Sequence, residues 1–293
     1  MQKSATGRAR TPHSTIPVRV CEDFFKRFVL PCLSMPKRGP LCKIGYWKSF
    51  NYMLKVLYTG MQWKELPIDK TPDGKPEIDY TVIYKQFARW AEDGSLAKFF
   101  EVSVKQLHDA GLLDLCVLHG DGTNTVAKKG GDGIGYSGHK HQRGEKIIAI
   151  VENNGYVLAP FPVASVNVND CILLPDSLNE LMRITRSIEV SLKGSFLNLD
   201  GVFDSKNNRK SIFNRGMVPN IPENKRNRKR SKQGPKRIFD AAIHKLRLVV
   251  ERTFAWEDKF KRLLLRFERI QSRHLGFKRV AYALINLRRF CPA

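Results

Sequence analysis

The chain has 293 residues and carries 51 Lys and Arg against 28 Asp and Glu, a formal net charge of +23. This excess of positive charge predicts a polyanionic partner, and nucleic acid is the first candidate. A hydrophobic content of 42% excludes a disordered chain. No run of 18 apolar residues and no leader-like segment are present, so we expect neither membrane insertion nor export. Six cysteines without a CxxC pair predict reduced thiols.

The first 114 residues divide into a basic arm and a helical region. Residues 1–20 have no acid and little apolar periodicity, which predicts a flexible arm. From residue 21 to 114, apolar residues at helical spacing predict helices at 22–32, 47–58, 80–92 and 96–110. We expect most aromatic residues here to be core, and we place DNA contacts on the third helix, at Lys85, Gln86 and Arg89.

After residue 115 the pattern changes to strands. Short apolar runs predict five strands, at 116–121, 146–152, 156–163, 195–200 and 218–222, the second and third forming a hairpin at an Asn-Asn-Gly turn. Helices are expected at 176–187, 205–216 and 238–263. The sequence therefore predicts an α/β domain over 115–270 with a mixed five-stranded sheet. A C-terminal helix within 271–293 is expected to pack on that domain with a basic outer face.

Three carboxylates fall at special places in this pattern. Asp121 and Asp200 each end an apolar run and precede a glycine. Glu251 lies on the long helix beside an expected buried stripe of Ile243, Leu246, Val250 and Phe254, flanked by Ala242 and Val249. Taken alone, Glu251 and Arg247 also fit an ordinary intrahelical ion pair. Buried carboxylates need a partner, however, and a divalent cation such as Mg²⁺ is the simplest one for three of them.

The three acids stand in the motifs HGDGT, LNLDGVFDS and VVERTFAW. In this order they resemble the DDE transposases of bacterial insertion sequences of the insertion-sequence-four/five type, most closely the insertion-sequence-five group. That family has Tyr, Arg, Glu and a basic residue at fixed intervals around the Glu. Here His244 stands in place of the Tyr, followed by Arg247 and Glu251, and the last position is Asp258, with Lys259 one residue later.

The resemblance implies an RNase H-like catalytic domain preceded by a small all-α, helix-turn-helix-like domain that reads the terminal inverted repeats. It implies catalysis and metal binding by Asp121, Asp200 and Glu251, with two Mg²⁺ ions for which Mn²⁺ substitutes, and support from His244, Arg247 and Lys259. Water would expose a 3′-OH that then attacks target DNA. We also expect a homodimer on double-stranded DNA, no nucleotide cofactor, and a location in the bacterial or archaeal cytoplasm at the nucleoid.

Two further segments are rich in glycine or in positive charge. Residues 130–138 lack the Gly-Lys-Ser/Thr ending of a phosphate-binding loop, so we expect a flexible active-site loop, followed by the basic or titratable residues His139, Lys140 and Arg143. The run at 223–237 has eight basic residues and one acid, which predicts phosphate contacts. Its candidate DNA-binding residues are Lys225, Arg226, Arg228, Lys229 and Arg230.

Three other functions remain open at this point. An RNase H-like nuclease would cleave DNA without joining strands and would not need an end-recognition domain. A DNA-binding regulator would use the helical region alone, with the acids structural. An inactive copy of a transposase would keep the fold and lose the chemistry.

Overall fold

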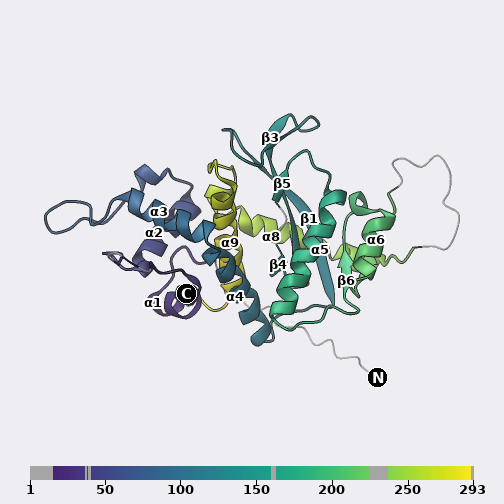
Figure 1. The fold of residues 1–293 in the computed structure, drawn as a ribbon. Helices are drawn as coiled ribbons and strands as arrows, with labels where there is room; N and C mark the ends of the chain where they lie inside the picture. Colours follow the sequence, from purple (N-terminus) through teal and green to yellow (C-terminus); the bar gives the residue numbers. More distant parts are fainter. Residues whose placement is uncertain (1–15, 37, 39–40, 160–162, 225–236, 292–293) are drawn as a thin grey trace, which may run out of the picture.

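The structure is a computed structural model that describes residues 16–36, 38, 41–159, 163–224 and 237–291. Figure 1 shows the N-terminal helices at one side, a twisted sheet with its helices at the other, and α9 between them. Within the described ranges, no helix combines the length and apolar character needed to cross a bilayer. Buried apolar residues from both parts form one continuous cluster, so the helices and the sheet share a core.

The N-terminal part is helical, as predicted. Its elements are α1 (Glu22–Phe24), η1 (Phe25–Val29), η2 (Leu30–Cys32), α2 (Tyr46–Thr59), η3 (Trp63–Glu65), α3 (Tyr80–Glu92) and α4 (Ser95–Asp109). Asp79 caps α3 by accepting a hydrogen bond from the Thr81 amide. Residues 60–79 separate α2 from α3, far more than the three or four residues of a helix-turn-helix turn. These two helices are therefore not joined as in a helix-turn-helix.

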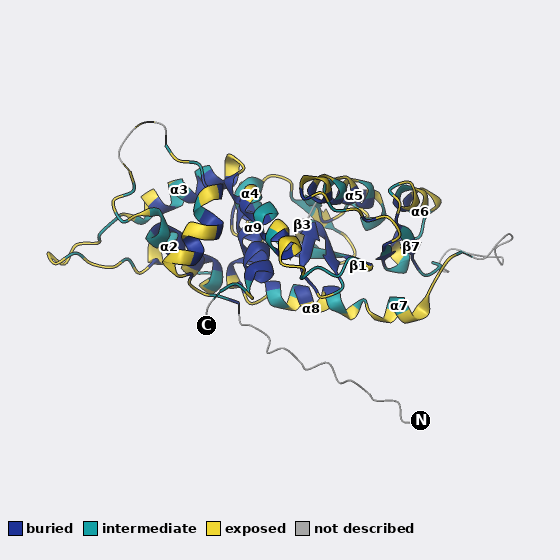
Figure 2. Ribbon diagram, turned by 90° about the horizontal axis from the view of Figure 1, so that it is seen from below, coloured by how far each residue is buried: buried dark blue, intermediate teal, exposed yellow. Residues whose placement is uncertain are grey.

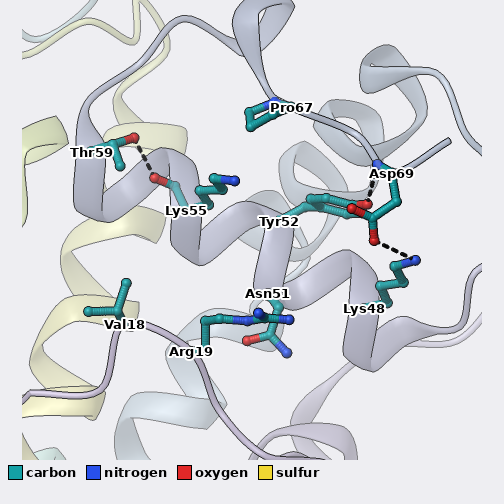
Figure 3. Close-up of a pocket in the computed structure, with 9 residues that line it drawn as sticks. All are labelled: Val18, Arg19, Lys48, Asn51, Tyr52, Lys55, Thr59, Pro67 and Asp69. Atoms are coloured by element: carbon teal, nitrogen blue, oxygen red, sulfur yellow. Dashed lines mark hydrogen bonds and ion pairs between the residues drawn. The ribbon is translucent and has the colours of Figure 1, made fainter. Parts of the chain in front are cut away.

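Side chains of α2 hold part of this long connection in place. Lys48 Nζ pairs with Asp69 at 2.9 Å and with Glu77 at 2.6 Å. The hydroxyl of Tyr52 donates to Glu77 and accepts from the Asp69 amide at 2.9 Å. Figure 3 shows the contacts of Lys48 and Tyr52 with Asp69, beside a pocket that Lys55 also lines. The charge of Lys48 is thus neutralised within the protein.

The sheet contains all five predicted strands and two short additional ones. The strands are β1 (Val117–Val126), β2 (Gly135–Ser137), β3 (Gln142–Glu152), β4 (Val157–Ala159), β5 (Val163–Ser165), β6 (Phe196–Asn198) and β7 (Val218–Asn220). The path runs β2-β3-β1-β6-β7, and β4 and β5 also pair with β3. β1 is antiparallel to β3 and parallel to β6, and β6 is parallel to β7. The expected count of five was too low, because the long β3 recruits β2 and β5.

Helices cover both faces of the sheet. The helical elements after β5 are α5 (Asp170–Ser187), η4 (Gly201–Phe203), α6 (Lys206–Phe213), α7 (Ala241–Lys245), α8 (Leu248–Glu257), η5 (Lys261–Leu263) and α9 (Gln271–Leu287). Both ribbon views place α5 and α8 on opposite sides of β1 and β3. With the additional strands β2 and β5 set aside, the order is three strands, a helix, a strand, a helix, a strand and a helix, as expected of an RNase H-like domain.

The predicted continuous helix over 238–263 is interrupted. α7 ends at Lys245 and α8 begins at Leu248, so Arg247 lies at the junction. The expected stripe fails at Leu246, which is 43% exposed, and holds at Val250, which is fully buried. Ala242 is exposed as well. α8 packs against β1 and β3, whereas α7 is tied by hydrogen bonds to the ends of β6 and β7 and remains mostly exposed, as Figure 2 shows.

The last helix, α9, belongs to the core of the molecule. It packs mainly against α4 and α3, and to a smaller extent against α8 and β4. The rings of Phe277 and Phe87 stack with centroids 4.0 Å apart. Lys278 is 1% exposed and pairs with the buried Glu257 of α8 at 2.6 Å. α9 therefore packs on the N-terminal helices as well as on the catalytic domain, where it was predicted. Because most of α9 is buried, it does not present the predicted basic outer face (Figure 2).

Candidate active site

Asp121 and Asp200 come together because the strands that carry them are neighbours. The parallel register of β1 and β6 ends at the pair His119 and Asn198. Each aspartate follows two residues later, so both lie where the pairing of β1 with β6 ends. Asp121 was predicted at a strand end, but β1 continues to Val126 along β3. The strand that ends here is β6.

Arg247 links the two carboxylates. Its Nη2 donates to Asp121 Oδ2 at 2.7 Å, and its Nη1 lies 3.6 Å from Asp200 Oδ1. The second oxygen of Asp121 accepts from the Gly122 amide at 2.8 Å. Burial raises the pKa of Asp121, while the charge of Arg247 and the Gly122 amide act in the opposite direction. A guanidinium thus supplies the counter-charge that two adjacent carboxylates require.

Glu251 lies one helical turn beyond Arg247 on α8 and is exposed. Its helix is fixed to the sheet by the buried Val250 and by Thr253, whose hydroxyl donates to the Gly155 carbonyl at 3.0 Å. Among the described residues, no three His, Cys, Asp or Glu side chains form a group that could hold a metal ion. The structure therefore brings Asp121 and Asp200 together around Arg247, and does not assemble the complete predicted triad.

A buried row of amide side chains positions the α7–α8 junction. Asn198 Nδ2 donates to the Ile243 carbonyl at 2.8 Å, and Asn198 Oδ1 lies 3.1 Å from His244 Nδ1. Asn220 exchanges two hydrogen bonds with the backbone of Asp240, at 2.7 and 3.0 Å. Both amides are fully buried. They tie the ends of β6 and β7 to the start of α7, and so place Arg247 against the aspartates.

Two histidines adjoin this row. His119 is fully buried on β1, with its Nδ1 3.2 Å from Asn198 Nδ2 and its Nε2 3.3 Å from Asn153 Oδ1. Burial lowers the pKa of His119 and that of His244. Both rings are therefore neutral partners of amides at neutral pH. The predicted support from His244 is a contact to Asn198, which orients the α7 segment.

Sequence reasoning gave Asn198, Asn220 and His119 no role. The available signal was a polar residue inside each short apolar strand, in VLHGD, SFLNLD and VPN. A buried amide or imidazole must find a hydrogen-bonding partner, so such positions mark contacts across the sheet.

Asp204 anchors both ends of the basic segment. It is almost fully buried, accepts from the Asn224 amide at 3.0 Å, and pairs with Arg209 at 3.0 Å and with Arg237. Burial alone would raise the pKa of Asp204, but the Asn224 amide and the two arginines together hold it below its usual value. The predicted contacts Lys225, Arg226, Arg228, Lys229 and Arg230 lie outside the described residues. The residues on either side of this segment, Asn224 and Arg237, are held close to η4, the short helix that Asp200 caps.

Lys259 does not reach the acid pair. It is exposed at the end of α8, with its Nζ 4.8 Å from the Trp256 ring centroid. The buried cation that contacts α8 is instead Lys278 of α9, which donates to Glu257 at 2.6 Å, as does the Tyr282 hydroxyl. This pair fixes α8 from its C-terminal end.

The glycine-rich segment is not a loop beside the aspartates. Its residues 135–137 form β2, which pairs with the start of β3, and Ser165 donates to the Gly133 carbonyl. His139, Lys140 and Arg143 are exposed around the tip of this hairpin. From Gln142 to Ala149, the partner of Asp121, seven residues of strand span about 24 Å. The tip therefore lies well away from the carboxylates.

The three predicted contacts on α3 differ in their availability. Lys85 is exposed, whereas Gln86 accepts a hydrogen bond from Ser49 and Arg89 lies 3.4 Å from the Ser34 carbonyl. Lys85 is thus the freest of the three.

Comparison with known proteins identifies the family. Residues 110–285 match the family model described as the transposase DDE domain, which is more than half of the chain. The chain belongs to this DDE transposase family. A transposase described for insertion sequence element IS402 of Burkholderia cepacia is 30% identical over 148 residues, which cover 48% of this chain and 62% of that relative. The DDE match includes Asp121, Asp200 and Glu251.

One solved transposase resembles the chain in fold. The piggyBac transposase in its synaptic complex with hairpin DNA superimposes with a TM-score of 0.51 at 10% identity, covering 92% of this chain and 72% of that one. The Mos1 mariner paired-end complex with Mn gives a TM-score of 0.27 at 9% identity, over 67% of this chain and 64% of that one. The first likeness confirms the predicted RNase H-like fold. The assignment to the insertion-sequence-five group remains a prediction.

Proposed function

We propose that this protein is a DNA transposase of a bacterial insertion sequence, which binds the terminal inverted repeats, cleaves DNA there and joins the freed end to target DNA. The observation that carries the proposal is the pairing of Asp121 and Asp200 at one edge of an RNase H-like sheet, in a chain of the DDE family. The net charge of +23 suits a DNA substrate.

The donor set suits a divalent metal ion. Asp121 and Asp200 offer hard carboxylate oxygens that already share one cationic partner, and Mg²⁺ favours such ligands. Asp121 and Asp200 would hold it, joined by Glu251 from α8, with Mn²⁺ able to substitute and two ions the expected number. When bound, the metal polarises the phosphodiester and lowers the pKa of the attacking hydroxyl or water.

The protein's own residues orient the reacting groups. Water attacks the phosphorus at the end of the element, the bond to the 3′ oxygen breaks, and a 3′-OH is released. That hydroxyl then attacks a phosphorus of the target strand, a new phosphodiester forms, and the target's own 3′ oxygen leaves. Once the two acids bind a metal ion, Arg247 is no longer needed as their counter-charge. It is then placed either to keep its contact with the aspartates or to contact a phosphate oxygen of the DNA. No nucleotide and no covalent enzyme intermediate are needed.

A strand-joining reaction tests this function. A labelled duplex carrying the element's end is incubated with target plasmid and Mg²⁺, using wild-type protein and the variants Asp121→Asn, Asp200→Asn and Glu251→Gln. The wild type is expected to join the end to the plasmid, and each variant to bind DNA without cleaving or joining it. Binding without cleavage by the wild type would favour a regulator or an inactive copy, and cleavage without joining would favour a nuclease.

Paired insertion requires the two ends of one element to be brought together, so we propose that the protein acts as a homodimer on DNA. A mass measurement of the protein bound to the element's end is expected to give two protomers. One protomer per complex under joining conditions would contradict the dimer.

A further inference from the structure

A continuous groove runs along the exposed side of α3. One hollow lies between α3 and the residues Pro36, Cys42 and Tyr46, a second beside Arg273, and a third between α3 and the segment that leads into α9. The first and second hollows share Lys85 and Arg89, and the second and third share Tyr84 and Arg273. The groove therefore connects the N-terminal helices to the DDE domain.

The DDE-domain end of this groove carries unneutralised positive charge. Lys129 and Arg269 line it, and both are exposed. Among the described residues, neither side chain has an ion-pair partner, in contrast to Arg262 and Arg273, which pair with Glu268 and Glu92. Two free cations therefore face a groove whose other arginines are already held. Sequence reasoning assigned no role to Lys129 or Arg269.

The middle of the groove is rigid and aromatic. The guanidinium of Arg273 on α9 lies 5.2 Å from the Tyr84 ring centroid and also donates to the Tyr84 hydroxyl. Trp63 contacts the same ring, with centroids 5.3 Å apart. These contacts join α3 to α9, the helix at the centre of the molecule in Figure 1. The two walls are thereby held at a fixed separation, which favours binding of a preformed, regular ligand.

The chain between Asp121 and Lys129 sets an upper limit on the distance between them. β1 runs from Asp121 to Val126, where the Arg266 amide donates to the Val126 carbonyl at 2.8 Å, and Lys129 follows three residues later. Eight residues of extended chain span at most about 28 Å. One turn of duplex DNA is about 34 Å long. A duplex with one phosphodiester at Asp121 is therefore long enough to reach Lys129 and Arg269.

We propose that this groove binds the phosphate backbone of the double-stranded DNA that is processed at Asp121 and Asp200, with Lys129 and Arg269 each contacting a phosphate. The inference rests on the proposed function for the identity of the ligand. In addition to the active site, the DNA then contacts this groove, which is formed jointly by α3 and the segments at 128–131 and 267–273. Backbone phosphates carry no sequence information, so the groove positions the duplex and does not select its sequence.

Salt dependence of DNA binding tests the groove. The probe is a random-sequence duplex of about 40 base pairs, because phosphate contacts require no particular sequence. Binding of wild type and of Lys129→Ala/Arg269→Ala is measured across a series of salt concentrations. Loss of two phosphate contacts is expected to reduce the slope of log K against log salt by about 1.8, and to weaken binding about tenfold or more at 0.1 M salt.

Two further variants provide the controls. Lys55→Ala/Lys193→Ala removes the same charge from exposed sites outside the groove, one of them in the pocket of Figure 3, and is expected to keep the wild-type slope. Lys129→Arg/Arg269→Lys keeps both charges and is expected to retain most of the slope. Circular dichroism checks that each protein is folded.

The proposal is overturned if the groove variant keeps the wild-type slope, or if the control pair loses as much. Its failure is distinct from failure of the proposed function. If the groove variant has a reduced slope but the wild-type protein never cleaves DNA, the groove proposal stands and the transposase function is rejected. If the groove variant binds DNA like the wild type and the wild-type protein joins strands, the transposase function stands and the groove proposal is rejected.

Discussion

Arg247 donates a 2.7 Å hydrogen bond to the carboxylate of Asp121, although 126 residues separate them in the sequence. The contact exists because Arg247 lies at the junction between α7 and α8, where the buried amides Asn198 and Asn220 hold α7 against the ends of β6 and β7. The same guanidinium lies within 3.6 Å of Asp200. One arginine thus neutralises two residues that the proposed function assigns to a metal ion.

Replacing Arg247 by Met should destabilise the metal-free protein, because two adjacent carboxylates lose their shared counter-charge. We expect the free energy of unfolding to fall by about 1–3 kcal/mol, as measured by urea denaturation in EDTA. Saturating Mg²⁺ should restore most of the loss if a cation takes the place of the guanidinium. The matched control is Lys105→Met, which breaks an exposed pair with Asp109 and should cost less than about 0.5 kcal/mol. Equal losses in the two variants would contradict this role for Arg247.

Replacing Asn198 by Leu keeps its approximate volume and removes its contacts to His244 and to the Ile243 carbonyl. We expect a loss of about 1–3 kcal/mol, since buried partners are left unsatisfied. DNA cleavage should fall while DNA affinity is retained, because the α7–α8 junction shifts and the charged surface does not. The control is Asn207→Leu, at an exposed position of α6. Unchanged cleavage in a destabilised Asn198 variant would leave the amide with a structural role only.

Glu257 and Lys278 form a buried ion pair between α8 and α9, with Tyr282 as a second donor to the carboxylate. Glu257→Leu leaves a buried ammonium without its partner and should cost about 3–5 kcal/mol. The double variant Glu257→Leu/Lys278→Met should recover a large part of this loss, because no charge is then stranded. Additive losses in thermal denaturation of the two single variants and the double variant would exclude the coupling.

Asp204 should make stability depend on pH at the acid end. Its contacts with the Asn224 amide, Arg209 and Arg237 hold its pKa below the ordinary value of 3.8, so its contribution is present above that value and is lost as pH falls through the lower, folded pKa. Asp204→Asn should therefore lower stability at neutral pH and flatten the acid limb. Urea midpoints measured from pH 2 to pH 7 check this. An acid limb of unchanged steepness in the variant would contradict it.

The fold was predictable where local pattern and tertiary packing agree. Five strands were found from apolar runs, and the Asn-Asn-Gly turn marked the hairpin, where Gly155 adopts a φ of +87°. The break at Leu246 was missed because helical spacing continues through it, while the hydrogen bonds from Asn198 and Asn220 that hold α7 past the sheet come from distant strands. Position along the chain likewise gave no sign that α9 would lie between α4 and β4.

The sequence predicted which residues belong to the candidate site better than it predicted how they are arranged in space. Asp121 and Asp200 could be paired from the sequence because the ends of neighbouring parallel strands lie at one edge of a sheet. The bridging position of Arg247 could not, because helical spacing only predicted a pair with Glu251 on the same helix. Lys129 and Arg269 give no local pattern at all. Their segments lie together in the fold, where the Asp132 amide donates to the Arg269 carbonyl at 3.0 Å, and both residues line the groove beside α3.

Metal specificity of an Asp121→Cys variant tests the central claim most directly. A thiolate is a poor ligand for Mg²⁺ and is accepted more readily by the softer Mn²⁺. If Asp121 binds the catalytic metal, DNA cleavage by Asp121→Cys should fall about 100-fold in Mg²⁺ and recover about tenfold or more in Mn²⁺, while Asp121→Ala stays inactive in both and all three proteins bind DNA alike. Cleavage in Mg²⁺ at the wild-type rate by either variant would contradict a metal-binding role for Asp121.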